Sequence, residues 1–329
     1  MTRPPAGTGA DVVCLGETMA VIAPADGRPL ATAAHLALGV GGAESNVACA
    51  VAGLGHRAAW AGRVGQDPFG TRILTELADR GVDISGATVD PERPTGLYAK
   101  DPGPTGTRTH YYRRHSAASR MGPGLASHPA LRAARILHLT GITAALSDSC
   151  AALLDALVVR RAAPGPLISF DINHRPALWR GGPRQAAPTL LALARAADVV
   201  FTGRDEAQTL WGTARPEDIR DLLAPAPLVV VKDAEHGATA YSTREGTTFV
   251  PARRLRVVEP VGAGDAFAAG YLAGLLEERD PVARLRLGHL AAAAALRTAA
   301  DLPTLPPRTA LDPWLTLDDA AWSTPDDQY

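Results

Sequence analysis

The chain has 329 residues, a formal net charge of -1 at pH 7 and 3 cysteines. It is long enough to bury the full core of a large α/β domain, and its balanced charge gives no electrostatic reason to expect a nucleic acid or a membrane surface as a partner. The widely spaced cysteines, the lack of an apolar leader behind Met1 and the lack of a long apolar run predict a cytoplasmic protein without a membrane span.

Short apolar runs alternate with helical patterns along most of the chain. Several of these runs are apolar throughout, as in a sheet that is covered on both faces. The alternation predicts an α/β fold with a doubly wound, mostly parallel sheet. The expected strands are Val12–Gly16, Ala58–Val64, Ile136–Thr140, Leu167–Ile172, Val199–Thr202 and Leu228–Lys232. The expected helices between them are Glu44–Leu54, Pro68–Arg80, Ser147–Arg161, Pro183–Ala196 and Glu206–Trp211.

A dense turn cluster at Asp101–Gly106 interrupts this alternation. The flanking runs, Gly96–Lys100 and Thr107–Arg113, predict a β-hairpin. Together with residues near Ala20–Leu38, the hairpin is expected to form a small sheet inserted in the main domain. Two interpretations of this sheet stay open, a lid over a substrate and a plain surface hairpin.

The C-terminal part begins with a second hairpin, made by Ala238–Ser242 and Thr247–Pro251. Two mainly apolar helices are expected after it, at Ala263–Glu278 and Val282–Thr298. Beyond them the chain becomes proline-rich and then acidic. We therefore expect residues 311–329 to form a mobile acidic tail.

The segment Glu259–Asp265, with the sequence EPVGAGD and here named the phosphate turn, carries the strongest chemical signal. Its glycines let the backbone approach a ligand closely, and the helix that follows directs the free amides of its first turn at that ligand. The pattern predicts a turn that holds an anion. The carboxylate of Asp265 among these amides indicates a base beside a phosphate, with a helix-capping role as the alternative.

Two other nucleotide motifs are excluded. A Walker A loop needs a lysine directly after a glycine, and neither Lys100 nor Lys232, the lysines of this chain, follows one. The run Gly39–Gly42 suggests a dinucleotide fingerprint, but it lies too far from the first strand, and its spacing fails at Glu44. The histidine spacing does not match a zinc site. The residues favour phosphoryl transfer without a Walker loop.

Three motifs, in this order along the chain, resemble the signatures of the ribokinase-like, or phosphofructokinase-B type, carbohydrate kinases. They are Gly41–Asn46 with its continuation to Gly55, Gly62–Gly70, and Val261–Gly270. The resemblance covers residues 12–306. It implies a kinase that transfers a phosphoryl group from ATP to a sugar alcohol.

The same resemblance implies an architecture. It predicts one ribokinase-like domain over residues 11–310, with a doubly wound sheet and a small β-sheet lid formed by segments at about 18–38 and 95–115. Lids of this family often pair, so a homodimer is expected from the resemblance. It assigns Asp265 as the catalytic base and the amides of Gly262, Ala263, Gly264 and Asp265 as the anion hole.

The lid hairpin and one strand end look like the branch of the family that acts on 2-keto-3-deoxygluconate. Alternation along a strand places Tyr111 and Arg113 on the same face, and Arg175 follows a strand end, where ligands of α/β sheets gather. Two arginines near a small substrate favour a carboxylate, which an aldonic acid has and a neutral sugar lacks. The segments that carry the likeness are Gly96–Tyr98, Tyr111–Ser119 and Asp171–Trp179.

By analogy, substrate contacts fall on the N-terminal motif, the lid and the strand end. Several of these residues also have a structural interpretation: a surface ion pair for Arg113 or Arg175, hairpin packing for Tyr98, a helix cap for Asn46 and a tight turn for Gly42. The assigned residues are Gly42, Ala43, Asn46, Tyr98, Tyr111, Arg113 and Arg175.

The nucleotide side is assigned by the resemblance to Glu206, Lys232, Gly237 and His289. We expect Mg²⁺ to arrive with ATP and to be held by phosphates and water, with no metal held directly by the protein, and activation by a monovalent cation stays open. Departures from the family pattern are Glu259 for an aspartate, Gly203 for the asparagine of N-x-x-E, Ala234 for a glycine, and Ala300-Asp301 for a glycine-containing loop linked to a monovalent cation.

The expected activity is therefore transfer of a phosphoryl group from ATP to the terminal hydroxyl of 2-keto-3-deoxygluconate, which gives the 6-phosphate. A kinase for a neutral sugar, fructose or ribose, is the first alternative. A sugar-binding protein that has lost catalysis is the second. The altered nucleotide-side residues favour this last interpretation, and the intact phosphate turn argues against it.

Overall fold

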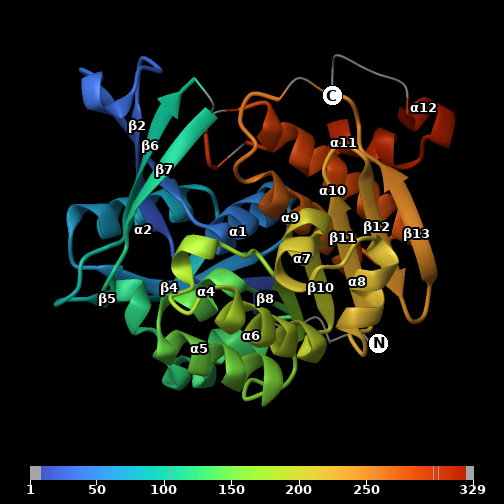
Figure 1. The fold of residues 1–329 in the computed structure, drawn as a ribbon, viewed down its shortest axis with the longest axis horizontal. Helices are drawn as coiled ribbons and strands as arrows, with labels where there is room; N and C mark the ends of the chain where they lie inside the picture. The colour runs from blue at the N-terminus through green and yellow to red at the C-terminus, as the bar shows by residue number, and fades with distance from the viewer. Residues whose placement is uncertain (1–8, 105, 256, 299, 303, 324–329) are drawn as a thin grey trace.

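The computed structural model describes residues 9–104, 106–255, 257–298, 300–302 and 304–323. These residues form a large sheet of 9 strands with helices on both faces, and a small sheet of 4 strands at one side (Figure 1). The strand order of the large sheet is β13-β12-β11-β10-β9-β8-β1-β4-β5, and pairing is parallel from β11 to β5. Its strands are β1 (Val12–Leu15), β4 (Ala58–Gly65), β5 (Asp83–Asp90), β8 (Ile136–Thr140), β9 (Leu167–Asp171), β10 (Val199–Gly203), β11 (Leu228–Asp233), β12 (Gly237–Ser242) and β13 (Gly246–Pro251).

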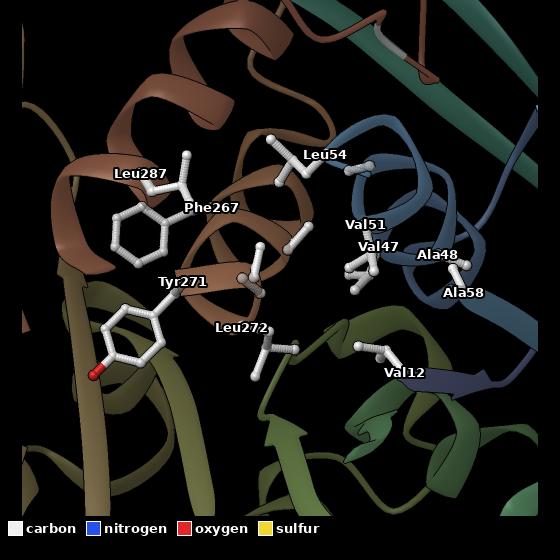
Figure 2. Close-up of a cluster of buried hydrophobic side chains, with 14 of the residues drawn as sticks. Val12, Val47, Ala48, Val51, Leu54, Ala58, Phe267, Tyr271, Leu272 and Leu287 are labelled. Atoms are coloured by element: carbon white, nitrogen blue, oxygen red, sulfur yellow. The ribbon is translucent and has the colours of Figure 1, made fainter. Parts of the chain in front are cut away.

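Two hydrophobic clusters, one on each face of the large sheet, form the core. Helix α9 is buried on nearly all sides between α1 and α10, and its side chains Phe267, Tyr271 and Leu272 pack into one cluster (Figure 2). A helix held in this way gives a rigid support to whatever its first turn binds. The helices of this face are α1 (Ala43–Gly53), α2 (Pro68–Asp79), α9 (Ala263–Leu276) and α10 (Pro281–Leu296). Those associated with the other cluster are α3 (Pro129–Ala133), α4 (Gly141–Leu146), α5 (Asp148–Leu154), α6 (Pro183–Ala196), α7 (Arg204–Trp211) and α8 (Pro216–Leu223).

The small sheet, here named the lid, has the strand order β3-β2-β6-β7. Met19, Val21 and Tyr98 are buried together on one of its faces, whereas Leu36 and Leu38 are exposed. The predicted fold, a doubly wound and mostly parallel sheet with a small β-sheet lid, is confirmed. The lid strands are β2 (Met19–Pro24), β3 (Leu36–Gly41), β6 (Leu97–Gly103) and β7 (Gly106–Tyr112).

The sequence patterns missed strand β5, the helices α3, α4 and α8, and one break in a helix. Strand β5 lies at the edge of the large sheet and alternates buried with exposed residues, so it lacks the continuous apolar run that identified the central strands. The single helix expected over Ser147–Arg161 is α5 followed by a wider turn of π-helix at Asp155–Val159.

The mobile tail predicted for residues 311–329 is wrong for its first part. Residues Arg308–Leu315 form helix α11 and Asp319–Ser323 form α12, while 324–329 lie outside the described residues. Trp322 is 1% exposed, and its carbonyl accepts a hydrogen bond from Arg253. The prediction rested on the acidic composition of this segment. Composition does not indicate the apolar and cation–π contacts through which the segment packs on the domain. None of the described helices has the length and apolar character that a membrane span needs.

Candidate active site

A cavity of about 560 Å³, here named the acceptor cavity, lies between the lid and the carboxyl ends of the central strands. Asp171, Gly203 and Lys232, at or near the ends of β9, β10 and β11, form part of its wall. Ligands of parallel α/β sheets bind at this edge because the loops there are free to diverge. All the residues assigned to substrate from the sequence line the cavity: Gly42, Ala43, Asn46, Tyr98, Tyr111, Arg113 and Arg175.

Asp265 lies in the first turn of α9 and lines the acceptor cavity. Its two carboxylate oxygens accept hydrogen bonds from Asn46 Nδ2 at 2.8 Å and from Asn173 Nδ2 at 3.3 Å. Burial raises the pKa of Asp265 to about 6, although the hydrogen bond from Asn46 acts to lower it. The carboxyl group is therefore held in one orientation and titrates close to neutral pH, as a general base requires.

The first amides of α9 belong to the phosphate turn. Gly262 precedes the helix at φ 83°, in the left-handed region that favours glycine, and thereby turns the chain into the helix. The first amides of a helix have no acceptor within it, so those of Gly264 and Asp265 are available to an anion. The amide of Ala263 makes a long hydrogen bond of 3.4 Å to the carbonyl of Pro260.

Lys232 adds a positive charge to these amides. A methyl carbon built on Gly264 would lie 3.4 Å from Lys232 Nζ, which places the ammonium group beside the helix start. The ammonium also donates to Asp171 Oδ2 at 2.9 Å. Burial acts to lower the pKa of Lys232, but the charges of Asp171 and Glu206 outweigh it and raise that pKa. The group stays protonated and can neutralise charge on a phosphoryl group.

Glu206 lies in the acceptor cavity rather than beside Gly237 and His289. Its carboxylate accepts hydrogen bonds from the Gly203 amide at 3.2 Å and from the His174 amide. The pKa of Glu206 is raised, first by burial and then by the charge of Asp171. The carboxylate therefore ties the start of α7 to the loop after β9.

Asn173 is a site residue that the sequence reasoning did not select. Its side chain supplies the second hydrogen bond to Asp265, and its backbone has φ 40°, which is uncommon outside glycine. It lies within the segment Asp171–Trp179 that carried the substrate likeness, so its place directly after a strand was the available signal. Together with Asn46, it fixes both oxygens of the carboxylate.

The two predicted arginines differ in their surroundings. Arg113 is buried, and its Nε donates to Glu17 Oε2 at 2.6 Å, while a second nitrogen of the guanidinium contacts the same carboxylate. Ser116 Oγ donates to the other oxygen of Glu17 at 2.6 Å. The carboxylate partner of Arg113 is thus already present in the protein, which the alternation of the strand did not indicate.

Arg175 is exposed at the cavity and donates to the carbonyl of His174 at 3.3 Å. No carboxylate of the described residues lies within ion-pair distance of its guanidinium, although its charge acts to lower the pKa of Asp265. Of the two arginines, Arg175 is therefore the one whose charge is not already paired. It is positioned to attract a negatively charged part of a ligand near Asp265.

Five residues of the lid strands line the cavity, Tyr98, Lys100 and Tyr111 among them. The rings of Tyr98 and Tyr111 lie 5.6 Å apart, and Tyr98 is buried while Tyr111 is exposed. Lys100, on the same strand as Tyr98, lies 2.9 Å from Asp301 Oδ1. Nothing in the local sequence marks Lys100 as a site residue.

A second cavity of about 590 Å³, here named the nucleotide cavity, shares Lys232 and Gly264 with the acceptor cavity. Gly237, Ala263 and His289 line it. The ring of His289 packs edge-to-face on Phe267, and burial lowers its pKa to about 4, so this histidine is neutral at physiological pH. The phosphate turn therefore lies where the two cavities meet, with the amides and Lys232 between them.

This arrangement fits an anionic phosphate chain. The free amides of α9 and the Lys232 ammonium supply donors where the two cavities meet, and the nucleotide cavity beyond is lined largely by apolar groups. Among the described residues, no group of three or more histidine, cysteine or acidic side chains is arranged to hold a metal ion.

Comparison with known proteins gives a consistent result. A model of the pfkB family of carbohydrate kinases matches residues 10–306. The chain is 36% identical over 313 residues to a 2-dehydro-3-deoxygluconokinase of Bacillus subtilis (strain 168), across 93% of this chain and 95% of the relative. It is 35% identical over 316 residues to a 2-dehydro-3-deoxygluconokinase of Thermoproteus tenax, across 94% and 95%. It is also 30% identical over 307 residues to a fructokinase-1 of Zea mays, across 90% and 94%.

Solved structures agree with this result. A pfkB protein from Polaromonas sp. JS666 superposes with a TM-score of 0.82 at 32% identity, across 92% of this chain and 99% of that one. A fructokinase from Vibrio cholerae O395, in a form that binds fructose, ADP and a potassium ion, superposes with a TM-score of 0.80 at 27% identity, across 94% and 99%.

Proposed function

Since this chain belongs to the pfkB family of carbohydrate kinases, we propose that it transfers the γ-phosphoryl group of ATP to the terminal hydroxyl of 2-keto-3-deoxygluconate. The chain is a sugar phosphotransferase, and the proposal concerns its acceptor. The observation that carries it is the unpaired charge of Arg175 in the cavity that also holds Asp265. A sugar acid has a carboxylate for this charge and a hydroxyl for this base.

The site residues have separate tasks in the reaction. Asp265 accepts the proton of the terminal hydroxyl as the sugar oxygen forms its bond to the γ-phosphorus. The bond from that phosphorus to the bridging oxygen of ATP breaks, and ADP leaves. The amides of Gly264 and Asp265, together with Lys232, neutralise the charge that develops on the moving phosphoryl group.

The acceptor is oriented by residues on both sides of the cavity. Asn46 and Asn173 hold Asp265, while Tyr98 and Tyr111 cover the sugar from the lid. Arg175 attracts the carboxylate, and Arg113, paired with Glu17, contributes donors that its partner leaves free. Gly42 and Ala43 lie at the start of α1, where the backbone approaches the sugar.

The residues on the nucleotide side also have separate tasks. ATP extends from the phosphate turn into the nucleotide cavity, where Gly237 and His289 contact its base, and Glu206 acts on the phosphate side through water. Mg²⁺ bound with ATP would add positive charge to the phosphates.

ATP as the donor and three buried free cysteines fit a cytoplasmic enzyme. The lid exposes Leu36 and Leu38, which fits a homodimer in which the lids of two chains pair.

The test is a coupled assay of ADP release with 2-keto-3-deoxygluconate, fructose and ribose. We expect the wild type to prefer the sugar acid and Asp265→Asn to reduce kcat by about 10²- to 10⁴-fold. Arg175→Ala is expected to lower kcat/KM for the acid by about 10- to 100-fold more than for fructose, because a charge-assisted contact is lost only from the acid. Arg180→Ala, an exposed arginine outside the acceptor cavity, is the matched control.

Each alternative has its own result in this assay. An equal loss on both sugars in Arg175→Ala would contradict the carboxylate assignment and favour a neutral sugar, to which the similarity to a fructokinase also points. No turnover of any sugar by the wild type, with retained sugar binding, would favour the protein that has lost catalysis.

A further inference from the structure

Lys100 occupies an unusual position for a lid residue. Its side chain is 8% exposed, and its ammonium lies 2.9 Å from Asp301 Oδ1 and 4.0 Å from Glu259 Oε2. These carboxylate side chains are themselves only 5% and 14% exposed. Because the desolvation of buried ions offsets much of their attraction, a gain in stability does not by itself account for this cluster.

One carboxylate belongs to the phosphate turn itself, and the other belongs to a segment that contacts the turn. Glu259 is the first residue of the turn, and its amide donates to the carbonyl of Leu296 at the end of α10. Asp301 lies beyond α10, and its carbonyl oxygen would be 3.3 Å from a methyl carbon built on Gly262. The ammonium of Lys100 therefore joins two segments that meet at the anion hole.

A second lid residue reaches the same carboxylate. Tyr98 lies two positions before Lys100 on β6, so the two side chains share one face of the strand, and both line the acceptor cavity. Burial and the interaction with Asp301 raise the pKa of Tyr98, so its hydroxyl stays protonated as a donor to Asp301. Asp301 is thus the point where the lid is attached to the phosphate-turn side of the site.

We propose that Lys100 is a positioning residue that couples the lid to the phosphate turn. With the lid over the acceptor, the ammonium neutralises Glu259 and Asp301 together and fixes the backbone around Gly262, and so aligns the amides that receive the phosphoryl group. The inference rests on the proposed kinase function. Since the chain supplies a cation at the loop around Asp301, we expect no activation by potassium, although the similar fructokinase structure contains that ion.

The experiment measures kcat and both KM values of the full chain with ATP and the sugar that the wild type turns over best. Lys100→Met is expected to reduce kcat by about 10- to 100-fold, through misalignment of the anion hole, and to change the KM for the sugar much less. Ethylammonium added to Lys100→Ala, which vacates the volume of the lysine side chain, is expected to restore part of the kcat. Lys100→Arg keeps the charge and should retain most activity, and Arg108→Met, an exposed cation of the same lid, is the matched control.

A double variant separates positioning from simple charge balance. In Lys100→Met combined with Asp301→Asn, the more deeply buried carboxylate no longer carries an unpaired charge and only that of Glu259 remains, so the thermal stability should recover in part while kcat stays low. Recovery of kcat in the double variant, an unchanged kcat in Lys100→Met, or potassium activation of the wild type would each overturn the inference. Failure of the proposed function would appear separately, as absent turnover of the sugar acid by the wild type.

Discussion

The acceptor cavity and the nucleotide cavity meet at Lys232 but are built differently. The acceptor cavity is held by ion pairs and hydrogen bonds between charged groups, among them Lys232 with Asp171 and Arg113 with Glu17. The nucleotide cavity is lined mainly by apolar side chains and backbone, with Phe267 against a neutral His289. Charge changes should therefore act mainly on the acceptor side, and packing changes on the nucleotide side.

Lys232 lines both cavities. Removal of its ammonium group should therefore lower activity more than a change that affects one cavity only. We expect Lys232→Met to lower kcat by about 10²- to 10³-fold, as for the loss of one donor to a transition-state anion. Steady-state kinetics with each substrate varied in turn would measure this. Lys232→Arg, which keeps the charge, should lose less. A rise in the KM for ATP alone, without a change in kcat, would assign Lys232 to the nucleotide side only.

The pH dependence distinguishes the two cavities through their titrating groups. Asp265 acts as a carboxylate, and its pKa is raised by burial to about 6, so kcat/KM for the sugar should fall about tenfold per pH unit below that value. His289, with its pKa lowered by burial to about 4, contributes nothing to this limb. The profile of His289→Gln should have the same acid limb as the wild type. A limb that moves in His289→Gln would place the titrating group on the nucleotide side.

A change in packing on the nucleotide side should have a smaller effect on activity than the changes in charge. Trp322, in α12, stacks near Arg253, which lines the nucleotide cavity, and its ring nitrogen donates to the carbonyl of Pro251 at 3.0 Å. Trp322→Ala should lower the free energy of unfolding by about 3 kcal/mol and raise the KM for ATP several-fold, with little change for the sugar. Trp322→Phe is the control. An increase in the sugar KM of the same size would contradict this separation of the two sides.

The sequence was most informative where chemistry depends on consecutive residues. The phosphate turn was predicted because glycines, an acid and an apolar helix follow one another, and α9 begins at Ala263, within that turn. The central strands were predicted for the same reason, because a strand buried on both faces is an unbroken apolar run. Strand β5 was missed because an edge strand has no such run.

Residue order alone was sufficient for the fold class and the phosphate turn, and with the family resemblance it selected seven residues that line the acceptor cavity. It was not sufficient for the pairing of Arg113 with Glu17, for Lys100 beside Asp301, or for the burial of Trp322. Each of these depends on contacts between residues that are far apart in the chain, and the energy of such a contact depends on burial and geometry, which no local pattern records. Folding therefore decided which charges are paired within the protein and which remain for a ligand.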